Sequence, residues 1–538
     1  MTGTMKRVAL AVGVAVGGLS LAPTAGAVSV SANNLGQALI FPYYTVRGGW
    51  TTLFGVTNTS NQVVAVKVRF REAYNSRDVF DFNLILSPYD LWTAWVTDSP
   101  NGPVIRTEDS SCTVGNIVGT GATGVTFPAP VSYVGAFADG GPTTVDRMRE
   151  GYVEMIMMGA SPGTPSAVFP LAAGAIHGST TGTPPGCAAL VSAFQNPALL
   201  GSYGACPTGT SAVSGVSGTL RGEFCNYPSY LTTPPGATAP VAVPLNPLKG
   251  TYALVNGAKG FNAVGLPVAL QNFRDTGAMT LQLDSVGAVA FNDSWHEPSL
   301  SSATSNGFQF IPTPTATDPG IYNYGGLGAT AVSDALAHTN VINEWSRRSN
   351  PAAGWVTATD WVLTFPTKNF FVDNDPGNRY AGRNTGRGNA TSSPGPAFAD
   401  PFTQMFVDTS LATPLRRGSS CDSISLTLRD REERASAGLG FSPGASPQLC
   451  YEANVLTFNQ GLILNSPIAA SVNYTDPFLF GWMNIGLTAM QDGTAAVTNT
   501  GLPVVGFAIT SRDDSATALL SEAALYDHSY VSPEASPP

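Results

Sequence analysis

Serine and histidine side chains are the first place to look for catalysis in this chain of 538 residues. The Gly-x-Ser-x-Gly pattern of a hydrolase nucleophile occurs twice, at residues 159–163 and 440–444. In both copies a proline follows the serine and removes the backbone N–H that would complete an oxyanion hole. The four histidines are scattered without a metal-binding pair: His177, His296, His338 and His528. The sequence therefore predicts no catalytic, metal-binding or cofactor-binding residues of these kinds.

Carboxylates are a second source of chemistry, because glycosidases need only two and these can come from distant strands. Six acidic residues stand near turns or strand ends: Asp78, Asp81, Asp90, Glu150, Glu154 and Asp360. Acidic side chains at such places are normally solvated. A secreted carboxylate-dependent hydrolase is therefore an alternative function and not the main prediction.

Two further patterns have chemical alternatives. Asp373 and Asp375 begin a loop with oxygen ligands at alternate positions, as in a calcium site, but the bidentate Glu of an EF-hand loop is missing. The same residue types are ordinary turn formers. Five tryptophans fall in predicted strands, where core packing is the default: Trp50, Trp92, Trp95, Trp355 and Trp361. Outward tryptophans in a row would instead form a platform for a sugar, which is the basis of the adhesin alternative.

The six cysteines give the clearest covalent prediction, because an even number in an exported chain is most simply read as three disulfides. Cys421 and Cys450 stand far from the other four, so we expect them to pair. Among the rest we favour two pairs and leave other pairings open: Cys112 with Cys187, and Cys206 with Cys225. No Cys-x-x-Cys and no nearby His indicates zinc.

The first 27 residues have the pattern of a secretory signal peptide. Lys6 and Arg7 precede the apolar run 8–21, and small residues lead to a cleavage site after Ala27. The run has 14 residues, fewer than the roughly 20 that span a bilayer, and no later run is longer. We therefore expect an exported protein without a transmembrane helix, extracellular or on the outer cell surface, with the periplasm as an alternative.

Composition excludes several classes of protein. Only 12% of the residues are charged, about half the roughly 25% of average domains, and 26 basic against 36 acidic residues give a net charge of -10. Such a chain is a poor partner for nucleic acid. Its aromatic content excludes a disordered coil. The 58 glycines and 41 prolines indicate a globular chain rich in turns.

Alternating apolar residues predict a mainly β fold. Five strands are expected in the N-terminal portion 28–110, at 38–44, 50–56, 63–71, 80–86 and 91–96. In the third of these, the alternation places Lys67, Arg69 and Arg71 on a solvent-exposed face. Short strands joined by turns are typical of an immunoglobulin-like antiparallel β-sandwich.

The rest of the chain divides by composition. Residues 111–247 are rich in Gly and Pro and predict long disulfide-pinned loops, with one strand at 151–158 and a short helix at 188–194. Residues 248–531 predict a second β-rich portion, including a strand at 355–366. Helical spacing from Ser333, as N-cap, to Trp345 predicts one helix there. Residues 532–538 are expected to be a disordered tail.

Several motifs resemble those of a family of exported, β-rich proteins in Gram-negative bacteria: 36–46 (GQALIFPYYTV), 57–60 (TNTS), 68–72 (VRFRE), 82–88 (FNLILSP) and 359–368 (TDWVLTFPTK). The resemblance spans most of the mature chain. It implies export and a β-rich architecture, and it implies no activity and no functional residues.

These observations together predict a non-catalytic structural protein of a cell-surface layer, matrix or filament. Its expected partners are further copies of itself or other surface components. A carbohydrate-binding adhesin, with glycan as its partner, and the secreted hydrolase are the alternatives.

Overall fold

The computed structural model is mainly antiparallel β-structure, which confirms the predicted fold class. The immunoglobulin-like topology stays a prediction. The structure describes residues 28–115, 117, 124–128, 141–162, 169–195, 223–224, 229–232, 241–273, 298–300, 303, 327–348, 355–369, 421–436, 439–444, 446–475, 479–487, 501–514 and 521–531. The predicted signal peptide, the tail and the loop of Asp373 and Asp375 lie outside these residues.

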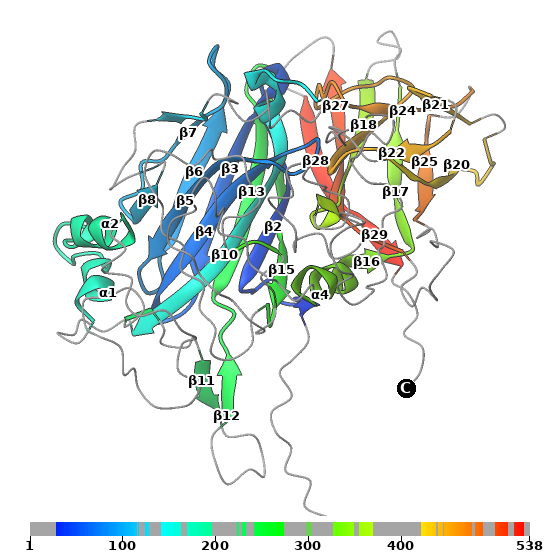
Figure 1. The fold of residues 1–538 in the computed structure, drawn as a ribbon. Coiled ribbons are helices and arrows are strands. Elements are labelled where there is room, and N and C mark those ends of the chain that lie inside the picture. Colours follow the sequence, from blue (N-terminus) through cyan, green and yellow to red (C-terminus); the bar gives the residue numbers. More distant parts are fainter. Residues whose placement is uncertain are drawn as a thin grey trace, which may run out of the picture.

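The N-terminal half of the chain builds a two-layered sandwich, the first sandwich (Figure 1). Sheet 1 has seven strands in the order β1 (Ser29–Val30), β15 (Val268–Gln271), β2 (Ala38–Thr45), β10 (Glu150–Pro162), β4 (Gln62–Glu72), β5 (Asp78–Leu86) and β8 (Cys112–Gly115). Sheet 2 has six strands in the order β14 (Phe261–Gly265), β13 (Leu248–Asn256), β3 (Thr51–Asn58), β6 (Leu91–Thr97), β7 (Val104–Arg106) and β9 (Val125–Thr126). The five strands predicted in the N-terminal portion are all present.

Alternation explains the core between these two sheets. Val66, Val68 and Phe70 of β4 point into it, because successive side chains of a strand face opposite sides. Phe54 of β3 meets Phe70 edge to face, with ring centroids 5.5 Å apart. Trp92 of β6 is buried in the same core. Aromatic and branched side chains of both sheets thus fill one continuous layer.

Strands from residues 248–271 complete the first sandwich. β13 pairs with β3 along its whole length, and β15 pairs with β2. β10, the strand predicted within the loop-rich region, lies between β2 and β4 in the middle of sheet 1. The division predicted at residue 247 therefore lies between strands that belong to the same sheets. It was drawn from composition, which does not reveal the pairing of distant strands.

The C-terminal part of the chain forms a second sandwich. Sheet 3 has four strands in the order β20 (Ser425–Asp430), β25 (Phe480–Gly486), β17 (Asn340–Ser346) and β29 (Ser529–Val531). Sheet 4 has six in the order β21 (Gly440–Ser442), β24 (Ala470–Asn473), β23 (Ala453–Phe458), β18 (Trp355–Thr364), β27 (Val505–Asp514) and β28 (Glu522–Asp527). β23 and β24 are parallel, whereas the other ladders of these sheets are antiparallel.

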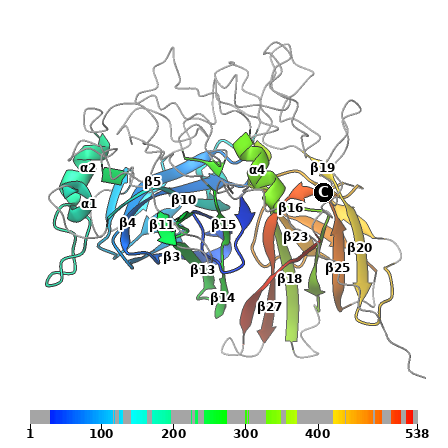
Figure 2. The ribbon, with the colours of Figure 1, turned by 90° about the horizontal axis from the view of Figure 1, so that it is seen from below.

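The two sandwiches lie side by side and share core residues (Figures 1 and 2). Trp361 of β18 packs toward sheet 3, whereas Val362, the next residue, packs into the core of the first sandwich. The Thr364 hydroxyl donates to the Pro42 carbonyl at 2.6 Å. β18, in the middle of sheet 4, is therefore packed on both of its faces, and the sandwiches form one packed body.

Short elements complete the description. The helices are α1 (Pro170–Gly174), α2 (Cys187–Gln195) and α4 (Leu327–Leu336), with 3₁₀ turns η1 (Arg47–Gly49) and η4 (Val145–Arg149). Three ribbons join β11 (Ser229–Thr232) with β12 (Val241–Pro244), β16 (Ala337–His338) with β26 (Leu502–Pro503), and β19 (Asp422–Ser423) with β22 (Gln448–Leu449). Within the described residues, no helix has the length and apolar character needed to cross a bilayer.

The helix predicted from Ser333 to Trp345 is wrong in most of its length. Ser333 lies inside α4, where its hydroxyl bonds that of Thr367 at 2.8 Å, and the chain turns extended after Leu336. β17 then buries Val341 and Trp345 and pairs with β25 and β29. The spacing of the apolar residues here fits the period of a helix and that of a strand. Pairing with distant strands therefore decides the conformation.

The three expected cysteine pairs have different outcomes. Cys421 and Cys450 form a disulfide, next to the paired strands β19 and β22, and so close the base of the hairpin that contains β20. Cys112 and Cys187 are both buried, free thiols that contact each other. Cys206 and Cys225 lie outside the described residues.

We expect the double substitution Cys421→Ser, Cys450→Ser to lower the free energy of unfolding by about 3 kcal/mol, because the bond closes a long loop. The cysteines are separated by 29 positions. Urea unfolding followed by tryptophan fluorescence measures the change. Glu432→Gln in the exposed turn of the same hairpin is the control. Equal stability of the double variant and the control would show that the bond contributes nothing.

Candidate functional site

A set of charged side chains lines the outer face of sheet 1, opposite the sandwich core. We call this set the charged face; it comprises Lys67, Arg69 and Arg71 of β4, Asp78 and Asp81 of β5, and Glu154 of β10. None of them is more than 2% exposed. The predicted solvent exposure of the three cations is therefore wrong. The alternation is present, but the second face of the strand is buried as well.

Each charge of the charged face has an opposite partner on a neighbouring strand. Arg71 Nε lies 2.6 Å from Glu154 Oε1, and Arg69 Nε lies 2.7 Å from Asp78 Oδ2. Lys67 pairs with Asp81. Three cations thus balance three carboxylates, which a buried charged layer requires, because an unpaired charge in the interior is strongly destabilising.

Two distant segments enclose the charged face. Arg69 Nη1 donates to the Pro298 carbonyl at 3.0 Å, and Ser299 is fully buried. The Tyr152 hydroxyl shares a 2.7 Å hydrogen bond with Ser76 and donates to the Pro366 carbonyl at 3.3 Å, beside the second sandwich. Burial, with Asp81 adding to it, raises the pKa of Asp78 to about 8, while Arg69 acts to lower it.

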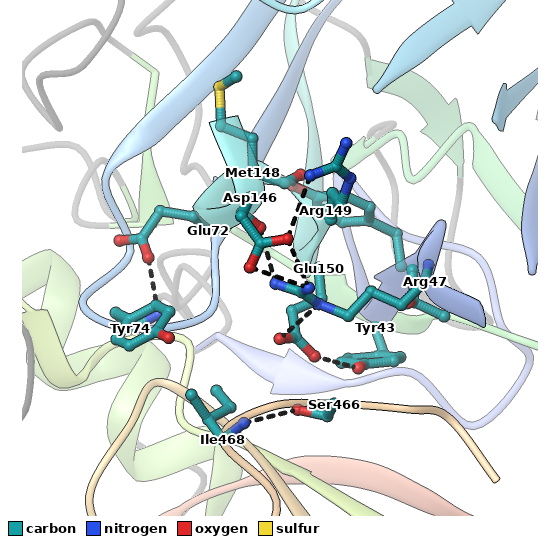
Figure 3. A network of polar contacts seen from close by, with 12 residues as sticks. Tyr43, Arg47, Glu72, Tyr74, Asp146, Met148, Arg149, Glu150, Ser466 and Ile468 are labelled. Carbon is teal, nitrogen blue, oxygen red and sulfur yellow. Dashed lines mark hydrogen bonds and ion pairs between the residues drawn. The ribbon is translucent and has the colours of Figure 1, made fainter. Parts of the chain in front are cut away.

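A second ionic cluster joins β2, η1, η4 and the first residue of β10 (Figure 3). Glu150 accepts from the Tyr43 hydroxyl at 2.7 Å and from Arg47 Nε at 2.9 Å. Arg47 Nη1 also donates to Asp146 at 3.0 Å, and Arg149 Nη1 donates to the same oxygen at 3.1 Å. Burial acts to raise the pKa of Asp146, but hydrogen bonds and charge from Arg47 lower it below its ordinary value.

The carboxylates that sequence reasoning offered for a hydrolase are therefore committed to internal contacts. Asp78, Asp81, Glu150 and Glu154 pair with cations. Asp360 instead accepts backbone N–H groups from the loop at 463–464, at 2.7 and 2.8 Å. These contacts stabilise the fold, and they lend no support to the hydrolase alternative.

The structure brings together one serine, histidine and aspartate that the sequence reading did not connect. Ser87 Oγ lies 2.8 Å from His177 Nδ1, and Asp90 Oδ2 lies 3.5 Å from the same nitrogen. In a catalytic triad the serine and the aspartate bind opposite nitrogens of the imidazole. Asp90 also accepts from the Ser87 backbone N–H at 2.9 Å. The cluster therefore caps a turn and does not have the geometry of a nucleophile.

Two other histidines have structural positions: His338 is half-buried and His528 is buried. Burial lowers the pKa of His338 to about 4, and its ring stacks on Tyr530. Burial also lowers the pKa of His528 to about 4, although its hydrogen bond with the Val362 carbonyl acts to raise it. His296 lies outside the described residues. Within the described ranges, no group of three or more His, Cys, Asp or Glu residues is placed to hold a metal ion.

The tryptophans divide between core and surface. Trp50, Trp92 and Trp361 are buried, as core packing predicts. Trp95 and Trp355 are partly exposed. The Trp355 ring lies beside the Arg512 guanidinium, 5.2 Å from its centroid, whereas Trp95 belongs to the outer face of sheet 2.

The outer face of sheet 2 carries a solvent-facing array of side chains from four neighbouring strands. Leu53 of β3 lies directly between Trp95 of β6 and Ala253 of β13, and Ala253 in turn faces Val264 of β14. Leu53 is 39% exposed and Val264 is 60% exposed. Threonines surround this row: Thr51, Thr57, Thr93, Thr97 and Thr251. We call these nine residues the threonine face.

Charge is nearly absent from this array. Lys249 of β13 and Arg106 of β7 lie at its margin, and the outward positions of β3, β6, β13 and β14 carry no carboxylate. Figure 2 shows β3 and β13 along the side of the first sandwich opposite β5 and β10. Sequence reasoning missed this surface, because it joins strands from residues 51–97 and 248–265.

Comparison with models of protein families, with curated proteins and with solved structures finds no match to this chain.

We expect Arg71→Met to destabilise the fold by about 3–5 kcal/mol, because it leaves Glu154 buried without its main cation. Adding Glu154→Gln should recover part of the loss, since it removes the uncompensated charge. Arg431→Met is the control, in an exposed pair with Glu432, and should leave the unfolding midpoint unchanged. Chemical unfolding measures all three. A midpoint of Arg71→Met equal to that of the control would contradict a structural role for the charged face.

Asp360→Asn should change how stability depends on pH. Burial raises the pKa of Asp360 from 3.8 to about 7, although the N–H groups of Leu464 and Ile463 act to lower it. The protonated folded state is therefore favoured at low pH, and its stabilisation is lost as the pH rises from about 4 to 7. The variant keeps an oxygen acceptor without this titration. Its stability relative to the wild type should rise by roughly 4 kcal/mol between pH 4 and pH 8. If the difference in the free energy of unfolding between variant and wild type stays constant from pH 4 to pH 8, the raised pKa of Asp360 is contradicted.

Proposed function

We propose that this protein is an exported, non-catalytic structural component of a cell-surface layer, matrix or filament, and that its copies associate through the threonine face. The observation that carries the proposal is the uncharged row of Leu53, Trp95, Ala253 and Val264 on the outer face of sheet 2, where Leu53 and Val264 are exposed. Central parts of protein interfaces are depleted of charge and enriched in aromatic and aliphatic side chains.

Charge favours a second copy as the occupant of this face. The chain carries a net charge of -10, so most approaches of two copies bring carboxylates together. At the threonine face the strands present no carboxylate, and the marginal charges of Lys249 and Arg106 are basic. Repulsion between copies is therefore weakest there. A two-fold contact would place the same uncharged row on both sides.

A carbohydrate-binding adhesin is the second candidate, and one observation favours it. Trp95 is partly exposed within the same row, flanked by threonine hydroxyls. An aromatic ring beside hydroxyl groups suits the apolar face of a sugar. One such ring is present in the row, whereas a sugar platform generally uses several, so self-association is the first proposal.

Leu53→Glu in the mature chain tests the proposal by introducing a carboxylate into the centre of the face. We expect it to weaken self-association at least about tenfold in analytical ultracentrifugation. Leu462→Glu is a matched control, since Leu462 is 38% exposed and lies in the loop between β23 and β24, outside the threonine face. It should associate like the wild type.

The possible outcomes separate the hypotheses. A wild-type chain that stays monomeric at every concentration, and occurs only in the medium, would contradict the structural function. Association that Leu53→Glu leaves intact would retain that function and reject the threonine face as its interface. Glycan binding by a monomer, abolished in Trp95→Ala, would decide for the adhesin.

A further inference from the structure

Two free thiols meet at the edge of sheet 1, away from the threonine face. Cys112 is the first residue of the edge strand β8, and Cys187 is the first residue of α2, which lies against β8 (Figure 1). Both belong to a small apolar cluster that includes Ile85 of β5 and Leu190 of α2. The packing of α2 on the strand edge thus fixes the two sulfurs beside each other.

Hydrogen bonds distinguish the two sulfurs. The Cys112 thiol donates to Cys187, and the backbone N–H of Thr113 donates to the same Cys187 sulfur. Cys187 also stands at the N-terminus of α2, where unpaired backbone N–H groups favour negative charge. Three features therefore stabilise a thiolate on Cys187.

Cys187 has both the lower pKa and the greater solvent exposure of the two cysteines. The hydrogen bond from Cys112 lowers the pKa of Cys187, and burial acts against it. The same bond, followed by burial, raises the pKa of Cys112. Cys187 is 8% exposed beside the exposed residues Pro185 and Ala188, whereas Cys112 is fully buried. A small reagent therefore reaches Cys187 first, and Cys112 lies behind it.

We propose that this pair is a thiol–disulfide exchange site in which Cys187 attacks a small disulfide, such as glutathione disulfide, and Cys112 resolves the product. The site is independent of the proposed assembly function. It assigns a thiol–disulfide exchange reaction to the contact between α2 and β8.

The reaction proceeds in two balanced steps. The Cys187 thiolate attacks one sulfur of glutathione disulfide, the sulfur–sulfur bond breaks, and one glutathione leaves as a thiolate that takes up a proton. Cys187 then carries no charge, so the Cys112 thiol loses the acceptor that held its proton. Cys112 gives up that proton to water and attacks the Cys187 sulfur, the bond from Cys187 to glutathione breaks, and the second glutathione leaves as a thiolate that takes up a proton. The protein thiols lose two electrons, and the reagent gains them as two thiols.

Single substitutions separate attack from resolution. Native full-length Cys112→Ser and Cys187→Ser are incubated with glutathione disulfide, quenched with acid, alkylated, digested and analysed by mass spectrometry. Serine at 112 retains a hydroxyl that can donate to Cys187. Cys112→Ser should accumulate glutathione on Cys187, because resolution is blocked. Cys187→Ser should leave Cys112 at least about tenfold less modified. The wild type, first reduced, should yield the Cys112–Cys187 disulfide without retained glutathione.

Folding is checked by the intact Cys421–Cys450 peptide in the same digests and by the melting temperature of each variant. Glutathione trapped on Cys187 in Cys112→Ser, with Cys112 protected in Cys187→Ser, supports the assignment. Folded Cys112→Ser that remains free of glutathione would overturn it. Equal modification of Cys187 in Cys112→Ser and of Cys112 in Cys187→Ser would overturn the order of attack.

Discussion

The buried charged face of sheet 1 is the constraint on which the rest of the fold depends. β4 presents Val66, Val68 and Phe70 to the core and Lys67, Arg69 and Arg71 to the other side. A slip of one residue would exchange these faces and drive three cations into the aromatic core. Register is therefore fixed, and β4 must lie between strands that supply carboxylates at matching positions. β5 and β10 meet this condition, because Arg69 faces Asp81 on one side and Glu154 on the other.

Burial of that face also requires the second sandwich and distant loops. An ionic layer on an open sheet would gain little from its pairs, because water screens them. Here the Pro298 carbonyl caps Arg69, and the Pro366 carbonyl accepts from Tyr152 beside the same layer. On the opposite side of the boundary, Trp50 Nε1 donates to the Ile463 carbonyl at 3.0 Å. Asp360 holds the adjoining N–H groups. The two sandwiches are thus joined by polar contacts at both places as well as by shared core.

Sequence periodicity predicts the strands of this protein well and their neighbours poorly. The strands at 38–96 and 355–366 follow from alternation, and the isolation of Cys421 and Cys450 was enough to pair them. Alternation does not say what covers a face, so the cations of β4 were expected to be solvated. A usable signal was present: β5 carries two acidic residues near its start, Asp78 and Asp81, and a short turn joins it to β4 and its alternating cations. No sequence pattern near β13 or β3 indicates that these two strands pair. The threonine face, which depends on that pairing, could therefore not be predicted.

Many charged side chains of this protein are buried, and their distribution differs between the two sheets of the first sandwich. Seven of the 26 basic and ten of the 36 acidic side chains are buried in the described residues. These charges are unevenly divided between the sheets, because the outer face of sheet 1 holds a buried ionic layer whereas the outward positions of β3, β6, β13 and β14 carry no carboxylate. A surface depleted of charge resists association weakly, since charge repulsion and hydration are what keep exposed sheets apart. The ionic layer that fixes the register of β4 keeps its charges inside the molecule, and the scarcity of charge on the outer face of sheet 2 is the reason for placing the proposed contact between copies there. The distribution of charged residues thus fixes the register inside sheet 1 and distinguishes the outer face of sheet 2 from it.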